Sequence, residues 1–258
     1  MTEKQAQEIM EKVRDTGSPL PNIAEYSEAL KITYNVLGND YTNEQLDNWI
    51  LIGKYPFLLP KYWNRETMQY EIDEDYKYNF TLLDEMPDGW RKAFGEMMCE
   101  EIKQELVRCD YLDEYMIIQI KEKYASLRWY DNGTPIGCKV LEIIDKYSVL
   151  SENICMICGK PDVPITGDVW FYPLCEKCYC TPNDYRKGDM TKEELKEFWD
   201  DRKKDWEAYN NKDNTMVNSY SIRKWSKEKD DIETIEYDIS ETANKIRSKW
   251  KAEHSKIK

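Results

Sequence analysis

Two pairs of cysteines carry the clearest chemical signal in this sequence. Cys155 and Cys158 form one Cys-x-x-Cys turn, Cys175 and Cys178 form a second, and sixteen residues separate the pairs. Each turn can present two thiolates to one ion, and sixteen residues suffice for a short β-excursion that returns the chain to the first pair. We therefore predict a single tetrahedral zinc site, with buried thiols or disulfides as the alternatives. Cys180 could compete as a ligand, although the Cys-x-x-Cys geometry favours Cys178.

Four thiolates leave zinc no open position at which to activate water, so the predicted ion is structural. A nuclease of the HNH type would need a histidine base, and the only histidine is His254, in a polar segment near the end of the sequence. The sequence also lacks a glycine-rich phosphate loop, a GxSxG elbow and an HExxH motif. It supports no specific reaction and favours a protein without catalytic activity.

The net charge of −13 is unevenly distributed along the 258 residues. Residues 190–258 hold 16 basic and 16 acidic residues, whereas residues 65–115 hold 15 acidic and 6 basic ones. Nucleic-acid binding depends on cationic contacts with phosphate, so this balance argues against it. An acidic surface suits solubility or a basic face on a partner protein.

No apolar run is long enough for a membrane helix, and Met1–Gln5 does not begin a signal peptide. We therefore expect a cytoplasmic protein in a reducing compartment, which agrees with eight cysteines used as zinc ligands and buried thiols.

The sequence predicts an α+β fold, mostly helical, with a small antiparallel β-hairpin and a four-cysteine zinc-ribbon or knuckle module. We expect three regions: a helical one over 1–54, an α+β core with the zinc module over 55–187, and a charged helical one over 188–258. The first region should contain helices at 2–14 and 24–37 and a third that starts at Thr42–Gln45, followed by apolar residues before Gly53. The aromatic segment 55–63, broken by two prolines, is expected to be an ordered loop.

The central region has the most regular pattern. One helical face starts at Gly89-Trp90 and contains apolar residues at helical spacing, namely Trp90, Phe94, Met97, Met98, Ile102 and Leu106. Residues 116–121 and 126–130 read as two strands, although Ile117 interrupts the alternation of the first. A helix should follow from Pro135, with Val140, Ile143, Ile144, Tyr147 and Leu150 facing inward. Cys99, Cys109 and Cys138 are expected to be buried thiols.

Four residues of this hairpin could form a binding site, because they place cations beside aromatic rings: Lys121, Lys123, Arg128 and Trp129. The alternative is that Leu127 and Trp129 pack inward while Arg128 and Lys121 cover the edge of the sheet.

The last region begins with a capping box, in which Thr191 precedes Glu194 by three residues. A helix should follow, then a short strand at 232–237 and a charged helix at 240–256. A basic group precedes this strand and could contact nucleic acid: Arg223, Lys224, Lys227 and Lys229, with Trp225 among them. The neighbouring Asp230 and Asp231 weaken it.

Several segments look familiar together: Tyr55–Pro60, Leu83–Trp90, the hairpin sequence KEKY…LRWY, and the Cys155–Gly159 knuckle. They resemble a family of small zinc-knuckle proteins of bacteriophages and bacterial mobile elements, over about residues 55–180. The resemblance implies a setting inside a bacterial host cell and no established activity. In that setting we expect a non-catalytic, zinc-stabilised protein that binds a host protein through its acidic surface and counteracts a defence or regulatory system. The alternative is a nucleic-acid-binding zinc-ribbon protein.

Overall fold

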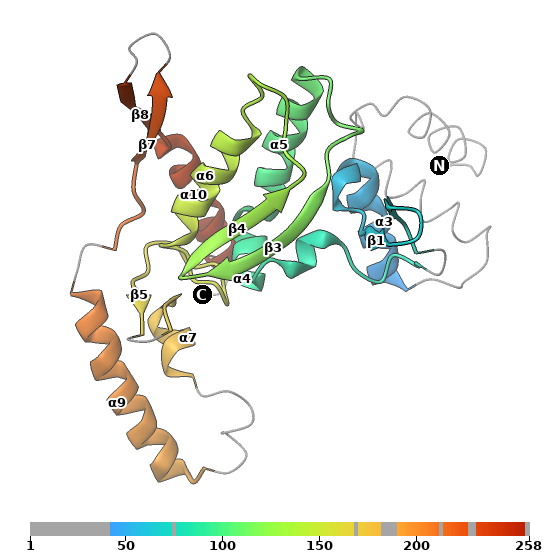
Figure 1. The fold of residues 1–258 in the computed structure, drawn as a ribbon. Coiled ribbons are helices and arrows are strands. Elements are labelled where there is room, and N and C mark those ends of the chain that lie inside the picture. The colour runs from blue at the N-terminus through green and yellow to red at the C-terminus, as the bar shows by residue number, and fades with distance from the viewer. Residues whose placement is uncertain are drawn as a thin grey trace. The chain divides into compact units, whose positions relative to one another are not determined.

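The computed structural model describes residues 42–73, 76–167, 170–181, 190–211, 214–226 and 231–255 (Figure 1). The predicted helices at 2–14 and 24–37 lie outside these residues. The chain divides into two compact units, residues 1–82 and 83–258, which are described separately. The three regions predicted from the sequence stay a prediction.

The first unit begins, in its described part, with the predicted helix α3 (Asn43–Lys54), which has a capping box at its start. The Thr42 hydroxyl accepts from the Gln45 amide at 3.2 Å, and the Gln45 side chain accepts from the Thr42 amide at 2.7 Å. A 3-10 helix η1 (Pro56–Leu58) and an antiparallel hairpin, β1 (Tyr62–Asn64) with β2 (Gln69–Glu71), follow. The predicted loop at 55–63 is therefore partly regular structure.

The core of the second unit is built on one long helical segment. The 3-10 helix η2 (Leu82–Glu85) begins at the end of the first unit, and α4 (Asp88–Trp90), a π-helix η3 (Arg91–Gly95) and α5 (Glu96–Arg108) then run without a break. The face predicted to be apolar is buried at Trp90, Phe94, Met98, Ile102 and Leu106. It packs against α6 (Val140–Ser151), where the rings of Phe94 and Tyr147 stack with centroids 5.2 Å apart.

The predicted hairpin consists of β3 (Ile117–Lys123) and β4 (Ser126–Asp131), paired antiparallel. Its register shifts between Ile117 and Gln119, and this bulge explains why Ile117 interrupts the alternation in the sequence. The amide of Leu127 donates to the Ser151 hydroxyl at 2.9 Å, which fixes β4 on α6.

After α6, the described residues of the second unit contain two more hairpins and three helices. The short strands β5 (Ile165–Thr166) and β6 (Tyr172–Pro173) pair, and α7 (Glu176–Cys180) and α9 (Lys192–Asn210) follow. Strand β7 (Ser219–Ser226) pairs with β8 (Asp231–Asp238), and α10 (Ser240–His254) comes last. The strand at 232–237, the Thr191 capping box and the last helix are confirmed, whereas β7 was not predicted.

The fold is thus mixed, as predicted, but the sequence indicated fewer strands than the structure has. The described residues form four separate two-stranded antiparallel sheets. Among the helices in the described ranges, none is both long and apolar enough to cross a membrane.

Candidate metal centre

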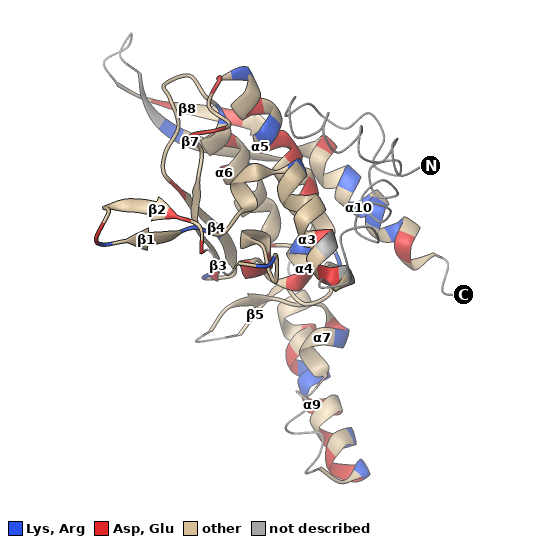
Figure 2. Ribbon diagram, turned by 90° about the vertical axis from the view of Figure 1, so that its right-hand side faces the viewer, with Lys and Arg blue, Asp and Glu red and all other residues tan. Residues whose placement is uncertain are grey.

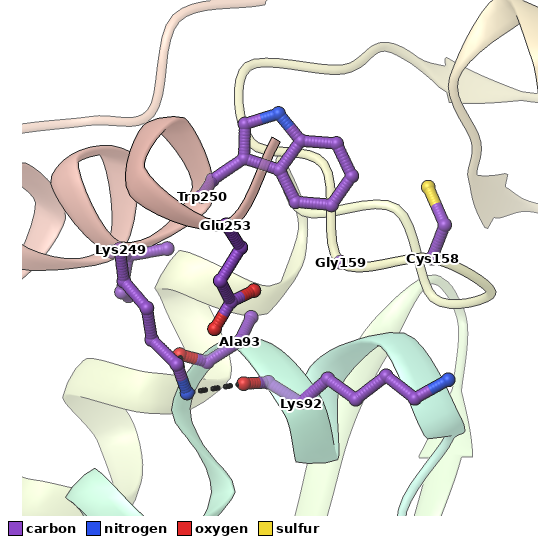
Figure 3. A pocket seen from close by; sticks show the side chains of 8 residues that line it. Lys92, Ala93, Cys158, Gly159, Lys249, Trp250 and Glu253 are labelled. Carbon is purple, nitrogen blue, oxygen red and sulfur yellow. Dashed lines mark hydrogen bonds between the residues drawn. The ribbon is translucent and has the colours of Figure 1, made fainter. Parts of the chain in front are cut away.

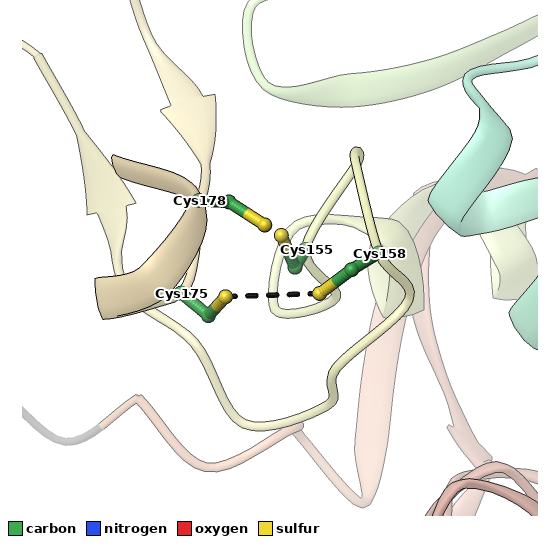
Figure 4. Close-up of side chains that lie close together, drawn as sticks. All are labelled: Cys155, Cys158, Cys175 and Cys178. Atoms are coloured by element: carbon green, nitrogen blue, oxygen red, sulfur yellow. Dashed lines mark hydrogen bonds between the residues drawn. The ribbon is translucent and has the colours of Figure 1, made fainter. Parts of the chain in front are cut away.

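The four predicted cysteine sulfurs come together in the structure. The Sγ atoms of Cys155, Cys158, Cys175 and Cys178 lie within 4.8 Å of one another (Figure 4). The Sγ atoms of Cys158 and Cys175 are 3.7 Å apart. Four sulfurs held tetrahedrally at about 2.3 Å from zinc would be about 3.8 Å apart. The group can therefore hold a metal ion with little movement.

The first turn is shaped by backbone hydrogen bonds around Cys155. Its amide donates to the carbonyl of Lys160, and its carbonyl accepts from the Gly159 amide, both at 2.8 Å. Gly159 has φ +84°, in the left-handed region, and a Cβ there would lie 2.7 Å from the carbonyl oxygen of Gly89. Glycine is therefore needed at the residue that follows Cys158.

The second turn is brought to the first by the β-excursion predicted between the pairs. The Met156 amide donates to the Pro173 carbonyl at 3.0 Å, and the Leu174 amide donates to the Pro164 carbonyl at 3.2 Å. Cys175 then starts α7, with its backbone still extended. The two turns are thus joined by main-chain bonds as well as by their sulfurs.

The thiols influence one another strongly. Hydrogen bonds from Cys158, Cys175 and Cys178 lower the pKa of the Cys155 thiol, so one thiolate is stabilised by the other three groups. The bonds to Cys155 in turn raise the pKa of Cys158 and Cys178. A bound cation would take the place of these protons, which would be released to solvent as at other metal-ligating cysteines.

The first turn is packed directly against the helical core. The Gly89 amide donates to the Met156 carbonyl, and Trp90 Nε1 donates to the Ile154 carbonyl, both at 2.8 Å. A Cβ on Gly89 would lie only 2.2 Å from the carbonyl oxygen of Cys155. The start of α4 and the first turn are therefore in backbone-to-backbone contact.

The second turn is packed against α9 instead. Trp206 Nε1 donates to the Leu174 carbonyl at 3.1 Å. The Arg202 guanidinium lies 3.7 Å from the centroid of the Tyr179 ring and donates to the Tyr179 carbonyl at 3.1 Å. The four-cysteine group therefore lies between a first turn that is bonded to the helical core and a second turn that packs against α9.

A small hollow lies beside Cys158 and Gly159 of the first turn (Figure 3). Its wall includes Trp250 of α10, and Lys249 Nζ donates to the Lys92 carbonyl nearby. The hollow has a volume of about 10 Å³, enough for about one water molecule. It is too small to be a substrate site.

The predicted binding residues of the hairpin are divided between its two faces. Trp129 is 6% exposed, and its Nε1 donates to the Tyr115 hydroxyl at 3.0 Å, so it belongs to the core. Lys121 and Arg128 are opposite each other on the other face, where Lys121 Nζ lies 5.2 Å from the centroid of the Tyr130 ring. Leu127 is also buried, as the packing alternative for this hairpin requires.

Lys123 lies on the same face as Lys121, with its Nζ 5.4 Å from the centroid of the Tyr124 ring. The three cations thus share a face that Trp129 does not reach. Binding by these residues stays a prediction.

The remaining cysteines differ in their surroundings. Cys99 and Cys180 are buried, and Cys180 is not part of the four-sulfur group. Cys109 and Cys138 are only half-buried, and they meet Glu105 in a second group that was not predicted. The spacing of Glu105 and Cys109, one helical turn apart, was visible in the sequence. The approach of Cys138 was not, because it depends on how α5 packs against α6.

No family model matches this chain, and neither a curated protein nor a solved structure is significantly similar to it. The resemblance to phage zinc-knuckle proteins stays a prediction.

Proposed function

We propose that this chain is a zinc-stabilised protein without catalytic activity, which acts by binding another protein. The observation that carries the proposal is the convergence of four cysteine sulfurs from two separate turns within 4.8 Å. A tetrahedral set of four sulfurs is typical of zinc or of an iron–sulfur centre. Two Cys-x-x-Cys turns that close one tetrahedron favour a structural zinc ion.

The proposed role of the ion is mechanical. It would tie the second turn, with α7 and α9, to the first turn, which is bonded to Gly89 and Trp90. Because all four positions are occupied by thiolates, the ion has no site for water or substrate. Metal analysis of the protein purified under reducing conditions should give one zinc per four-cysteine group, and Cys178→Ser should lose it. Iron, or no metal at all, would contradict this role.

The proposed partner is a protein with a basic surface. Residues 84–114 hold ten acidic and four basic residues, and Figure 2 shows acidic residues along α5 in this part of the chain. Several of the acidic side chains already have internal roles: Asp84 pairs with Arg91, and Glu101 pairs with Lys146. Asp113 and Glu114 are exposed beyond the end of α5, so they are available to a partner. Complementary charge of this kind raises association rates and selects partners.

By the resemblance described above, the partner would be a host protein of a defence or regulatory system, met in the bacterial cytoplasm. The test is affinity capture from a bacterial lysate, followed by binding of the purified partner to wild type and to the double variant Asp113→Lys/Glu114→Lys. The matched control, Glu193→Lys/Glu197→Lys, makes the same change in net charge on the exposed side of α9. We expect the first variant to bind more slowly and the control to bind as wild type does. Equal binding by both variants would contradict an acidic docking face.

Nucleic-acid binding is the second candidate, and one observation favours it. Lys121, Lys123 and Arg128 share one face of the β3–β4 hairpin with the half-exposed ring of Tyr130. Cations beside an aromatic ring suit phosphates and a stacked base. If the captured partner is a nucleic acid, affinity should fall steeply with salt and should be lost in Lys121→Glu/Lys123→Glu. That result would replace the protein-binding proposal.

A further inference from the structure

A second group of metal-ligating side chains precedes the four cysteines in the sequence. A carboxylate oxygen of Glu105 and the sulfurs of Cys109 and Cys138 lie within 4.8 Å of one another. Glu105 and Cys109 are one turn apart at the end of α5, and Cys138 lies in the segment that leads to α6. All three residues are half-buried, so the group is open to small ions from solvent.

The donors are held in place by hydrogen bonds. Arg108 donates from Nε to Glu105 Oε2 at 2.8 Å and from Nη2 to Oε1 at 2.5 Å. The same Nη2 is 3.3 Å from Cys109 Sγ and donates to the Gly137 carbonyl at 2.8 Å. The Lys139 amide donates to Glu105 Oε1 at 2.6 Å. These bonds join the end of α5 to residues 137–139, and so keep Cys138 beside Cys109.

The chemistry of this donor set suits a soft divalent cation. Thiolates prefer zinc and similar soft ions, and a carboxylate is an accepted third ligand. Two thiolates, one carboxylate, the Arg108 guanidinium and a divalent ion would together be neutral. The guanidinium contact with Cys109 also stabilises the thiolate form. On Glu105, Oε1 accepts from Arg108 Nη2, from the Lys139 amide and, at 3.6 Å, from the Cys109 thiol, so this oxygen lies beside the sulfurs.

We propose that Cys109, Cys138 and Glu105 form a second, weaker site for a soft divalent cation, which is filled after the four-cysteine site. Three protein donors leave one coordination position for water, so the ion in this site can exchange and can meet external ligands.

Protons compete with the ion at this site. Burial, followed by the hydrogen bond with Cys138, raises the pKa of the Cys109 thiol to about 11.

The test is titration of the metal-free, reduced full chain with Cd²⁺, with bound ions counted by native mass spectrometry. Wild type should bind one ion tightly and a second more weakly, and Cys138→Ser should bind only the first. The control Cys180→Ala also removes one cysteine, but from outside both groups, and it should keep both ions. A single ion in wild type, or a second ion that survives in Cys138→Ser, would overturn the proposal.

A second measurement uses only the wild-type protein, so it holds even if Cys138→Ser disturbs the fold. Alkylation of Cys138 by iodoacetamide, followed by peptide mass spectrometry, should slow in wild type once Cd²⁺ exceeds one equivalent. An unchanged alkylation rate would overturn the proposal. The same spectra would reveal a Cys109–Cys138 disulfide by the loss of two hydrogens. If that disulfide forms with a low-molecular-weight disulfide as oxidant, and no second ion binds, the pair is a redox site and the proposal is wrong.

Discussion

Gly89 is the position where one methyl group should separate the first cysteine turn from the core. The Cβ of an alanine there would lie 2.2 Å from the Cys155 carbonyl oxygen, 2.6 Å from the Gly159 amide nitrogen and 2.7 Å from the Met156 carbonyl carbon. All three atoms belong to the backbone, so no side-chain rotation can relieve the contacts. The start of α4 and the turn must therefore move apart by about 1 Å or more, to reach ordinary contact distances.

The cost of this movement follows from the contacts that it breaks. Overpacking of a tight site costs about 1–3 kcal/mol. The Gly89–Met156 and Trp90–Ile154 hydrogen bonds would also be stretched, at about 1 kcal/mol each. The better helix propensity of alanine offsets about 1 kcal/mol of this cost. The free energy of unfolding of Gly89→Ala should therefore be about 3 kcal/mol lower than that of wild type. In a unit of this size that lowers the melting temperature by about 6–12 °C.

The assay is equilibrium urea unfolding followed by tryptophan fluorescence, at a fixed free zinc concentration, because bound metal shifts apparent stability. Gly95→Ala is the matched control, since this buried glycine lies in the same helical segment. Its Cβ would meet only side chains, with Arg91 Cγ at 3.3 Å and Leu83 Cδ2 at 3.5 Å. The control should stay within about 1 kcal/mol of wild type. If Gly89→Ala is as stable as Gly95→Ala, the backbone contact between α4 and the turn does not stabilise the protein.

Three further outcomes are expected. Removal of the metal with a chelator should increase hydrogen exchange in α9 while α5 and α6 stay protected; equal protection of α9 with and without metal would show that the ion does not hold this helix. Arg202→Ala should lower the free energy of unfolding by about 1–2 kcal/mol, because it loses the ring contact and the hydrogen bonds to Tyr179, and it should speed hydrogen exchange in α9. The control Lys204→Ala, on the exposed side of α9, should change neither. Burial, with the nearby Tyr78, raises the pKa of Tyr76 to about 12, and burial raises the pKa of Tyr115 and Tyr147 as well. Because the pKa of an unfolded tyrosine is about 10, stability should be intact below pH 10 and should fall as the pH rises above it. In a pH titration followed by tyrosinate absorbance, some tyrosines of the folded protein should ionise only well above pH 10. Ionisation of all tyrosines together near pH 10 would contradict this.

The parts of the fold that were predictable depend on local patterns. The Thr42 and Thr191 capping boxes, the buried helical face from Trp90 to Leu106, and the two Cys-x-x-Cys turns each occupy a few neighbouring residues. Their geometry follows from spacing along one segment, so a single sequence reveals them.

The parts that were missed depend on contacts between distant segments. Strand β7 contains Arg223 and Lys224 and looked like a basic patch, but it is fixed by pairing with β8, including the stacked rings of Tyr220 and Tyr237 at 5.1 Å. The π-helix at Arg91–Gly95 inserts a wide turn, which no local apolar pattern indicates. The sequence left open whether Trp129 binds a ligand or packs inward, because alternation alone does not say which face of a hairpin is covered; the structure buries its ring.

Helix α10 has a consequence for how the protein is made. Arg247 pairs with Asp162, 85 residues earlier, and Lys249 donates to the Lys92 carbonyl, 157 residues earlier. Such distant pairings are slow to form, because a long chain must be searched before they contribute. During synthesis, the surfaces of the π-helix and of the first cysteine turn that α10 covers therefore stay exposed to solvent until residues 240–254 have left the ribosome. Chains interrupted before that point would present these surfaces to chaperones and proteases.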